Sequence, residues 1–493
     1  MNLSRRMILS GLLASAAVPA WAEAPERSIR PVTRASDLSK QPKQVQRAIK
    51  SAEDMVAEAR LGGKVSYAVA DARTGELLET GSPLLGQPPA STAKALTSLY
   101  ALETLGPEYR FTTRLVATGP VTNGRIDGDL VLVGGGDPTL DTNALAEMAA
   151  DLKKAGVREI SGKFRVWAGA MPYVRALEPA QPDHLSYNPS LSGLNLNYNR
   201  VHFEWKQTGS DYSVTMDARA GRYRPDVTVA RMSVVDRSLP VYTYADANGR
   251  DEWTVARSAL GSGGARWLPV RRPDLYAGEV LQTLARSQGI ILGDSVEIAT
   301  SDQGTELVTR KSAPLPDVLR DMLKYSTNLT AELVGLTTSA QAGGSLRGLI
   351  DSAAHMNGWL KRTGDAGSAR LVDHSGLSGE SRISAADMVS MLVKAPQRDR
   401  LRGLMKTYPL EDRPGVVVQA KTGTLNFVSA LVGYVSSPGS PDLAFAIFCA
   451  DPPRRDALSE AEMESPDGGK AWLQRARRLQ RQLLARWSSI HAT

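Results

Sequence analysis

The chain has 493 residues, of which 42% are hydrophobic and 23% are charged. This length corresponds to about three domains, and the apolar share is enough to give each a core, which excludes a mainly disordered protein. The 59 basic and 52 acidic residues give a net charge of +7 without a basic block, so we expect no nucleic-acid partner.

The first 22 residues have the pattern of an export signal. Arg5 and Arg6 precede an apolar run from Met7 to Pro19, and Ala20-Trp21-Ala22 forms a small-x-small cleavage site. The paired arginines also resemble the twin-arginine signal, with an ordinary secretory signal as the alternative. We therefore expect cleavage after residue 22 and a periplasmic mature protein.

The next segment predicts a helix, a hairpin and a second helix. Apolar residues recur at helical spacing from Val45 to Ala59, and residues 65–80 alternate between apolar and polar on both sides of a turn. A further helical pattern runs from Ser91 to Leu105 and stops at Gly106-Pro107. Ser91 is therefore expected at a helix N-terminus.

Short strand-like runs and turn clusters replace this pattern from about residue 111 to about residue 300. We interpret them as one or two inserted β-rich domains, residues 113–304. The stretch Gly134-Gly135-Gly136-Asp137-Pro138 lacks the Gly-Lys-Ser/Thr that a phosphate-binding loop requires. We expect a turn there.

Helical periodicity returns after residue 304, on both sides of Ser326-Thr327-Asn328, and three antiparallel strands are expected between Val416 and Ala450. The single cysteine, Cys449, lies in the last of these strands, and we expect a buried apolar residue rather than a reactive thiol. The final predicted helix, Trp472 to Trp487, has a basic face. We expect it to pack on the sheet, with a membrane-surface helix as the alternative.

Ser91 and Lys94 lie three residues apart, so a helix places the hydroxyl and the amine on one face. Serine alone is a poor nucleophile, but a lysine whose pKa is lowered by burial can accept its proton. The pattern Ser-x-x-Lys also occurs by chance, and its alternative is a helix-capping serine beside a surface lysine.

Two further groups follow in order along the chain. Ser326 offers a hydroxyl for proton relay, and Asn328 offers an amide that can bind a substrate peptide bond. Lys421-Thr422-Gly423 offers a cation, a hydroxyl and space for substrate backbone, and the N–H of Thr424 could form an oxyanion hole with that of Ser91. Similar triplets at 73–75, 186–188 and 362–364 lack the flanking apolar helices or strand.

The ordered set Ser-x-x-Lys, Ser-x-Asn and Lys-Thr-Gly is the signature of penicillin-binding proteins and class A β-lactamases. The stretches ASTAK (90–94), YSTNLTAEL (325–333), DHSGLS (373–378) and AKTGTL (420–425) bear a closer resemblance. They resemble the type-4 penicillin-binding protein family (low-molecular-mass class C), which are D-alanyl-D-alanine carboxypeptidases/endopeptidases. GGGDPTL (134–140) and GLNLNYNRV (193–201) are also similar, so the resemblance covers about residues 45 to 490.

The resemblance implies an α/β multidomain fold, in which a β-rich insertion interrupts a transpeptidase/β-lactamase-like helix-sheet-helix domain with an antiparallel sheet. The two parts of that domain would be residues 23–112 and 305–493. Asp183 resembles a family acidic residue that meets the substrate's side-chain amine, with a plain loop aspartate as the alternative. His374 replaces a usual glycine, and we expect a loop histidine rather than a catalytic base.

The implied activity is that of a serine carboxypeptidase and endopeptidase on peptidoglycan peptides, with an acyl-enzyme that β-lactams also form. Ser91 would attack, Lys94 would accept its proton, and Ser326 would protonate the leaving amine. Asn328 and Lys421-Thr422-Gly423 would hold the substrate. No metal or cofactor is expected, and peripheral membrane contact stays open. The alternatives are a slow-turnover module that binds wall peptide and a serine β-lactamase, for which we find no deacylating glutamate.

Overall fold

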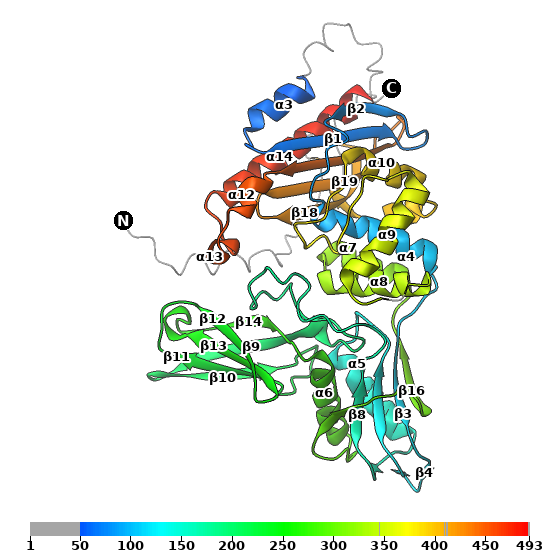
Figure 1. Ribbon diagram of the computed structural model, residues 1–493, viewed down its shortest axis with the longest axis vertical. Helices are drawn as coiled ribbons and strands as arrows, with labels where there is room; N and C mark the ends of the chain where they lie inside the picture. Colours follow the sequence, from blue (N-terminus) through cyan, green and yellow to red (C-terminus); the bar gives the residue numbers. More distant parts are fainter. Residues whose placement is uncertain (1–49, 345, 409, 411–412, 492–493) are drawn as a thin grey trace, which may run out of the picture.

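The structure is a computed structural model that describes residues 50–344, 346–408, 410 and 413–491. The predicted export signal, residues 1–22, lies outside the described residues. Figure 1 shows two parts: an upper part built from both ends of the chain, and a lower part built from the middle. We use these names for residues 50–111 with 312–491 and for residues 112–311.

The upper part contains a six-stranded antiparallel sheet in the order β17-β18-β19-β20-β1-β2. Strand β1 pairs with β20, so the beginning and the end of the chain share one sheet. The predicted hairpin and the three antiparallel strands are confirmed. The bounds are β1 (Lys64–Asp71), β2 (Leu77–Gly81), β17 (Lys406–Tyr408), β18 (Val417–Leu425), β19 (Val428–Ser436) and β20 (Leu443–Ala450).

Helices cover both faces of this sheet (Figure 1). Because side chains alternate along a strand, Ala68 and Ala70 pack with the helices of one face, whereas Tyr67 and Val69 pack with those of the other. The first face carries α4 (Ala93–Thr104), α7 (Leu315–Tyr325), α8 (Asn328–Gln341), α9 (Leu349–Gly364), α10 (Ala385–Lys394) and α11 (Arg398–Leu404). The second carries α3 (Ala52–Ala59) and α14 (Gly469–Ile490).

The predicted helix-sheet-helix arrangement is therefore confirmed. The C-terminal helix α14 packs on the sheet through an apolar stripe that includes Trp472 and Leu483, as expected. Cys449 is fully buried in β20. Within the described residues, no helix combines the length and the apolarity needed to cross a membrane.

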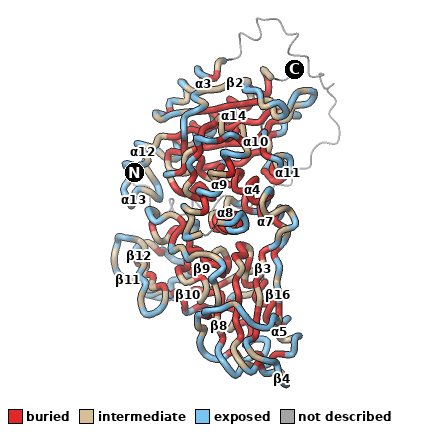
Figure 2. The backbone as a smooth tube through the Cα atoms, turned by 45° about the vertical axis from the view of Figure 1, so that its right-hand side comes forward, coloured by how far each residue is buried: buried red, intermediate tan, exposed pale blue. Residues whose placement is uncertain are grey.

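The lower part contains a five-stranded mixed sheet in the order β15-β8-β6-β3-β16, and smaller sheets beside it. Figure 2 shows buried residues along the larger sheet, whereas β11 and β12 are largely exposed or half-buried. The larger sheet comprises β3 (Thr112–Ala117), β6 (Leu130–Gly134), β8 (Phe164–Trp167), β15 (Val296–Ile298) and β16 (Thr305–Lys311). The smaller sheets comprise β9 (Arg200–Thr208), β10 (Asp211–Asp217) and β14 (Gly263–Pro269); β11 (Ala230–Val235), β12 (Tyr242–Ala247) and β13 (Arg250–Ala256); and β4 (Val121–Thr122), β5 (Arg125–Ile126) and β7 (Glu159–Ile160).

Strand β16 follows the predicted limit at residue 304, yet it pairs with β3 as the edge strand of the lower part's sheet. The predicted limits of the inserted domains, 113–304, otherwise stay a prediction.

Two helices of the lower part were not expected from the sequence: α5 (Thr142–Lys154) and α6 (Pro273–Ser287). Both segments nevertheless have apolar residues at helical spacing. Leu145, Met148 and Leu152 recur at helical spacing in α5, and the Asp141 carboxylate caps its N-terminus by accepting from the N–H of Ala144 at 2.8 Å.

The predicted turn at Asp137 is confirmed, because its carboxylate accepts from the N–H of Thr139 at 2.8 Å.

Candidate active site

Ser91 lies in η2 (Ala90–Thr92), a single turn that leads into α4. Its neighbour Ala90 has a left-handed backbone with φ of 46°. The DHSGLS stretch packs directly on this turn, since a Cβ on Gly376 would stand 1.8 Å from the Ala90 carbonyl oxygen. Only glycine allows this approach, which fixes the backbone that presents Ser91.

Lys94 is completely buried on the first turn of α4. Its Nζ donates to three oxygens: Ser91 Oγ at 3.1 Å, Asn328 Oδ1 at 2.8 Å and the Ser375 carbonyl at 2.7 Å. Burial lowers the pKa of Lys94 to about 8, against the opposing charges of Glu332 and Asp373. The predicted contact between the serine and the lysine is present, and this lysine can lose its proton at moderate pH.

The second and third motifs meet beside it. Ser326 ends α7 in a left-handed conformation with φ of 60°, and Asn328 begins α8. Lys421 on β18 donates to Ser326 Oγ at 3.0 Å and to the Thr422 carbonyl at 2.7 Å. Burial, and then the charge of Lys94, hold the pKa of Lys421 well below its usual value. The fold thus brings all three predicted motifs together.

The edge of β18 also approaches the Ser91 turn. A Cβ on Gly423 would stand 2.7 Å from the Pro89 carbonyl oxygen, so the strand can come this close because residue 423 is glycine. Thr422 and Thr424 are exposed and line a cavity of about 280 Å³ together with Arg477 and Arg481 of α14. The oxyanion hole formed by the Ser91 and Thr424 N–H groups stays a prediction.

Glu332 was missed by the sequence analysis. It is fully buried on α8, one turn after Asn328, and its carboxylate accepts from the N–H groups of His374 at 3.0 Å and Ser375 at 2.8 Å. These bonds hold the Ser375 carbonyl against Lys94. Burial, and then the charge of Asp373, raise the pKa of Glu332.

Asp373 was missed as well. Its carboxylate accepts from the Ser378 N–H and from Ser381 Oγ, both at 2.9 Å, and burial raises its pKa. Both acids lie in stretches that carry the family resemblance. They accept mainly from backbone N–H groups, however, and no pattern of residue types in the sequence identifies such partners.

His374 lies in a loop, as expected, but its side chain is fully buried. Its Nε2 is 2.7 Å from Ser352 Oγ, its ring packs against Gly335, and its carbonyl accepts from Thr97 Oγ1 at 2.7 Å. Burial lowers the pKa of His374 to about 3, so the ring is neutral. Its contacts are those of a packing residue.

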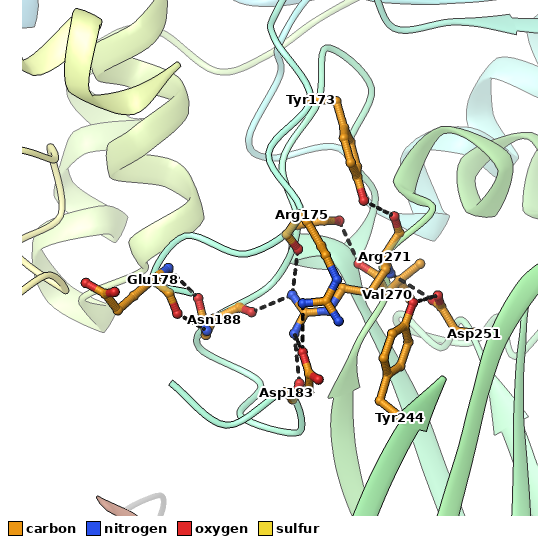
Figure 3. A network of polar contacts seen from close by, with 10 residues as sticks. Tyr173, Arg175, Glu178, Asp183, Asn188, Tyr244, Asp251, Val270 and Arg271 are labelled. Carbon is orange, nitrogen blue, oxygen red and sulfur yellow. Dashed lines mark hydrogen bonds and ion pairs between the residues drawn. The ribbon is translucent and has the colours of Figure 1, made fainter. Parts of the chain in front are cut away.

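Asp183 lies in loop 174–191 of the lower part, which the backbone pair of Val174 and Leu191 closes. Its carboxylate is 3.0 Å from Arg175 and 3.4 Å from Arg271 (Figure 3). The structure thus places this carboxylate in an ion-pair network. Its predicted contact with a substrate amine stays a prediction.

Residues 48–467 match the D-Ala-D-Ala carboxypeptidase 3 (S13) family. The chain is 30% identical over 439 residues to the D-alanyl-D-alanine carboxypeptidase of Actinomadura sp. strain R39, which covers 80% of this chain and 78% of that one. It is 26% identical over 386 residues to D-alanyl-D-alanine carboxypeptidase DacB of Haemophilus influenzae, with 73% and 79% covered.

Solved structures show the same architecture. Penicillin-binding protein 4 (dacB) from Haemophilus influenzae has a TM-score of 0.72 at 21% identity, covering 88% of this chain and 99% of that one. A structure of the same protein complexed with a β-lactam has a TM-score of 0.70 at 22% identity, again covering 88% and 99%. These likenesses confirm the expected α/β multidomain fold.

Proposed function

Because this chain belongs to the D-Ala-D-Ala carboxypeptidase 3 (S13) family and is a serine-type D-Ala-D-Ala carboxypeptidase, we propose that it works through an acyl-enzyme on Ser91 and also cleaves peptidoglycan cross-links. One observation carries the acyl-enzyme. The Nζ of Lys94 is completely buried and lies 3.1 Å from Ser91 Oγ. A neutral amine at that place is a base for the serine proton.

In the proposed reaction, Ser91 Oγ attacks the carbonyl carbon of the penultimate D-alanine while its proton passes to Lys94. The C–N bond then breaks, and Ser326, which Lys421 contacts, passes to the leaving amine the proton that Lys94 accepted. Asn328 orients the substrate amide, and Lys421 and Thr422 hold the terminal carboxylate. Water then attacks the acyl carbon and gives a proton to Lys94, and the Ser91 oxygen takes that proton as the ester bond breaks, which restores the hydroxyl.

We further propose that the protein acts in the periplasm on wall peptides, after removal of residues 1–22. Penicillin would acylate the same serine, in line with the relative whose structure contains a β-lactam. Cleavage of cross-links uses the same chemistry, because a cross-link is also an amide that follows a D-alanine carbonyl.

Intact-mass spectrometry after incubation with penicillin, beside a sample given a pentapeptide ending in D-Ala-D-Ala, tests the proposal. The expected result is a stoichiometric penicilloyl adduct on Ser91 and release of D-alanine, both lost in Ser91→Ala. An adduct without D-alanine would indicate a slow-turnover module or an enzyme that needs cross-links. Rapid release of hydrolysed penicillin would indicate a β-lactamase. No adduct would reject the acyl-enzyme.

A cross-linked peptide dimer tests the endopeptidase activity separately. The expected result is conversion to monomers, with Ser91→Ala inactive. An enzyme that trims the pentapeptide but leaves the dimer intact would be a carboxypeptidase alone.

A further inference from the structure

The side-chain amide of Asn328 lies between the two parts of the molecule. Its Oδ1 accepts from Lys94 Nζ at 2.8 Å, and its Nδ2 donates to the Tyr187 carbonyl of the lower part at 3.0 Å. We propose that loop 174–191 completes the active site by fixing the orientation of this amide, and that Arg271 is the positioning residue that holds the loop. The inference deepens the proposed function and rests on it.

The amide has one favourable orientation in this place. A protonated Lys94 can only donate, so it requires the amide oxygen, whereas the Tyr187 carbonyl can only accept, so it requires the amide nitrogen. Without that carbonyl the amide can turn over and direct its N–H groups at Lys94, donor against donor. The Tyr187 contact uses one N–H of Asn328, and the second N–H suits a substrate carbonyl.

The loop reaches Asn328 as an ordered unit. Val174 and Leu191 close it through two backbone hydrogen bonds of 2.9 Å and 2.8 Å. Leu177 and Leu191 pack in one apolar cluster with Leu329 and Leu333 of α8, the helix that carries Asn328. The loop therefore rests on the helix whose first side chain it contacts.

Arg271 fills the inside of the loop (Figure 3). Its side chain is 2% exposed, and it donates to the carbonyls of Arg175 at 2.7 Å, Asn188 at 2.9 Å and Asp183 at 2.8 Å. Asn188 directly follows Tyr187, so its bond fixes the peptide next to the carbonyl that Asn328 requires. A guanidinium group is permanently charged and planar, and it can hold several oxygens at once.

The backbone of Arg271 is held by two side chains, one that contacts its N–H and one that contacts its carbonyl. Its N–H donates to the buried Asp251 carboxylate at 2.7 Å, and its carbonyl accepts from the Tyr173 hydroxyl at 2.8 Å. The adjacent Arg272 instead pairs with Asp246 at the surface. These two neighbouring arginines provide a matched pair of variants.

The pH dependence of Ser91 acylation reports the protonation of Lys94. The groups that face it are Ser91 of η2, Asn328 and Glu332 of α8, Asp373 and the Ser375 carbonyl of the DHSGLS loop, and Lys421 of β18. The Asn328 oxygen favours the ammonium form, so misorientation of this amide would lower the pKa of Lys94. The acidic limb of Ser91 acylation would then move to lower pH.

The test compares Arg271→Met with Arg272→Met in the full-length mature protein, by the second-order rate of acylation by a fluorescent penicillin across the pH range and by thermal unfolding. In Arg271→Met we expect the plateau rate to fall about tenfold and the acidic limb to move to lower pH. Arg272→Met should keep both. If Arg271→Met does not fold, the same measurement is made on Arg271→Lys. Lysine keeps the positive charge but lacks the two terminal N–H groups that donate to the three carbonyls.

A fall in rate that is equal at every pH and follows the folded fraction would overturn the proposal, because it indicates a purely structural arginine. So would an unchanged rate and profile in a folded Arg271 variant. Failure of the proposed function has a different result, since the unaltered protein would then form no adduct on Ser91.

Discussion

A buried lysine of the upper part and a buried arginine of the lower part serve different purposes. Lys94 of the upper part and Arg271 of the lower part both lie inside the protein, donate to several oxygens and have a buried carboxylate nearby. Burial lowers the pKa of Lys94 to about 8, near the working range of a base. It lowers the pKa of Arg271 too, but from so high a value that the guanidinium stays charged. Burial thus makes a base of the lysine and a fixed support of the arginine.

Replacing Lys94 by arginine should have the largest effect, a loss of Ser91 acylation. Lys94→Arg keeps the positive charge but removes the group that can lose a proton, so Ser91 acylation by penicillin should fall by about a thousandfold. Quenched-flow labelling with a fluorescent penicillin measures the rate. Lys361→Arg, an exposed exchange on α9, is the control. A variant that acylates within tenfold of the unaltered protein would show that another group takes the proton.

Asp251, whose carboxylate accepts from the Arg271 N–H, should make the free energy of unfolding depend on pH. Burial raises the pKa of Asp251 from 3.8 to about 6, so the native protein loses stability as pH rises through this interval. Asp251→Asn does not titrate, and its unfolding free energy relative to the unaltered protein should rise by about 2 to 3 kcal/mol from pH 3.5 to pH 7. Urea unfolding at the two pH values measures the change, with the exposed Asp294→Asn as control. A pH-independent difference would mean that Asp251 keeps an ordinary pKa.

Glu332, the buried acid near Lys94, should affect the pKa of that lysine. Glu332→Gln removes a carboxyl group whose ionised form favours the ammonium form of Lys94, and it turns one oxygen into a donor that faces a backbone N–H. We expect the plateau rate of acylation to fall about tenfold and the acidic limb to move to lower pH. The control is Glu103→Gln, an exposed change on α4. A limb that moves to higher pH would contradict the assigned sign.

The exposed ion pair beside Arg271 should have the smallest effect. Arg175 and Asp183 are 3.0 Å apart with side chains 50% and 39% exposed, so Arg175→Gln should change stability by less than about 1 kcal/mol. Arg271 holds residue 175 by its carbonyl, which glutamine retains. Thermal unfolding and penicillin acylation measure this. A loss as large as that of Arg271→Met would mean that the ion pair holds the loop.

Arg175→Gln also tests the predicted role of Asp183. If this carboxylate meets a substrate amine, its release from Arg175 should lower KM for a pentapeptide with a free side-chain amine and leave penicillin acylation unchanged. An unchanged KM would support the alternative, a plain loop aspartate.

The sequence was sufficient where a local pattern decides the structure. The spacing of Ser91 and Lys94 predicted their contact, and successive apolar runs predicted the strands around Lys421. The contact between Lys421 and Ser326 depends on how distant elements pack, and the order of the motifs only suggested it. Glu332 and Arg271 act on backbone N–H and carbonyl groups, which every residue except proline has, so their partners follow from the fold alone. Helices α5 and α6 had readable patterns that the surrounding strand-like runs outweighed.

The antiparallel pair of β3 and β16 has a consequence for how the lower part is joined to the upper part. Thr112 and Lys311, the first and last residues of the lower part, are directly paired, so the chain leaves and re-enters the upper part at adjacent points about 5 Å apart. A short turn would span this gap, and the strand order of the upper sheet includes no residue of the lower part. A chain without residues 112–311 would have to orient Asn328 by other means, because the carbonyl of Tyr187 lies within them.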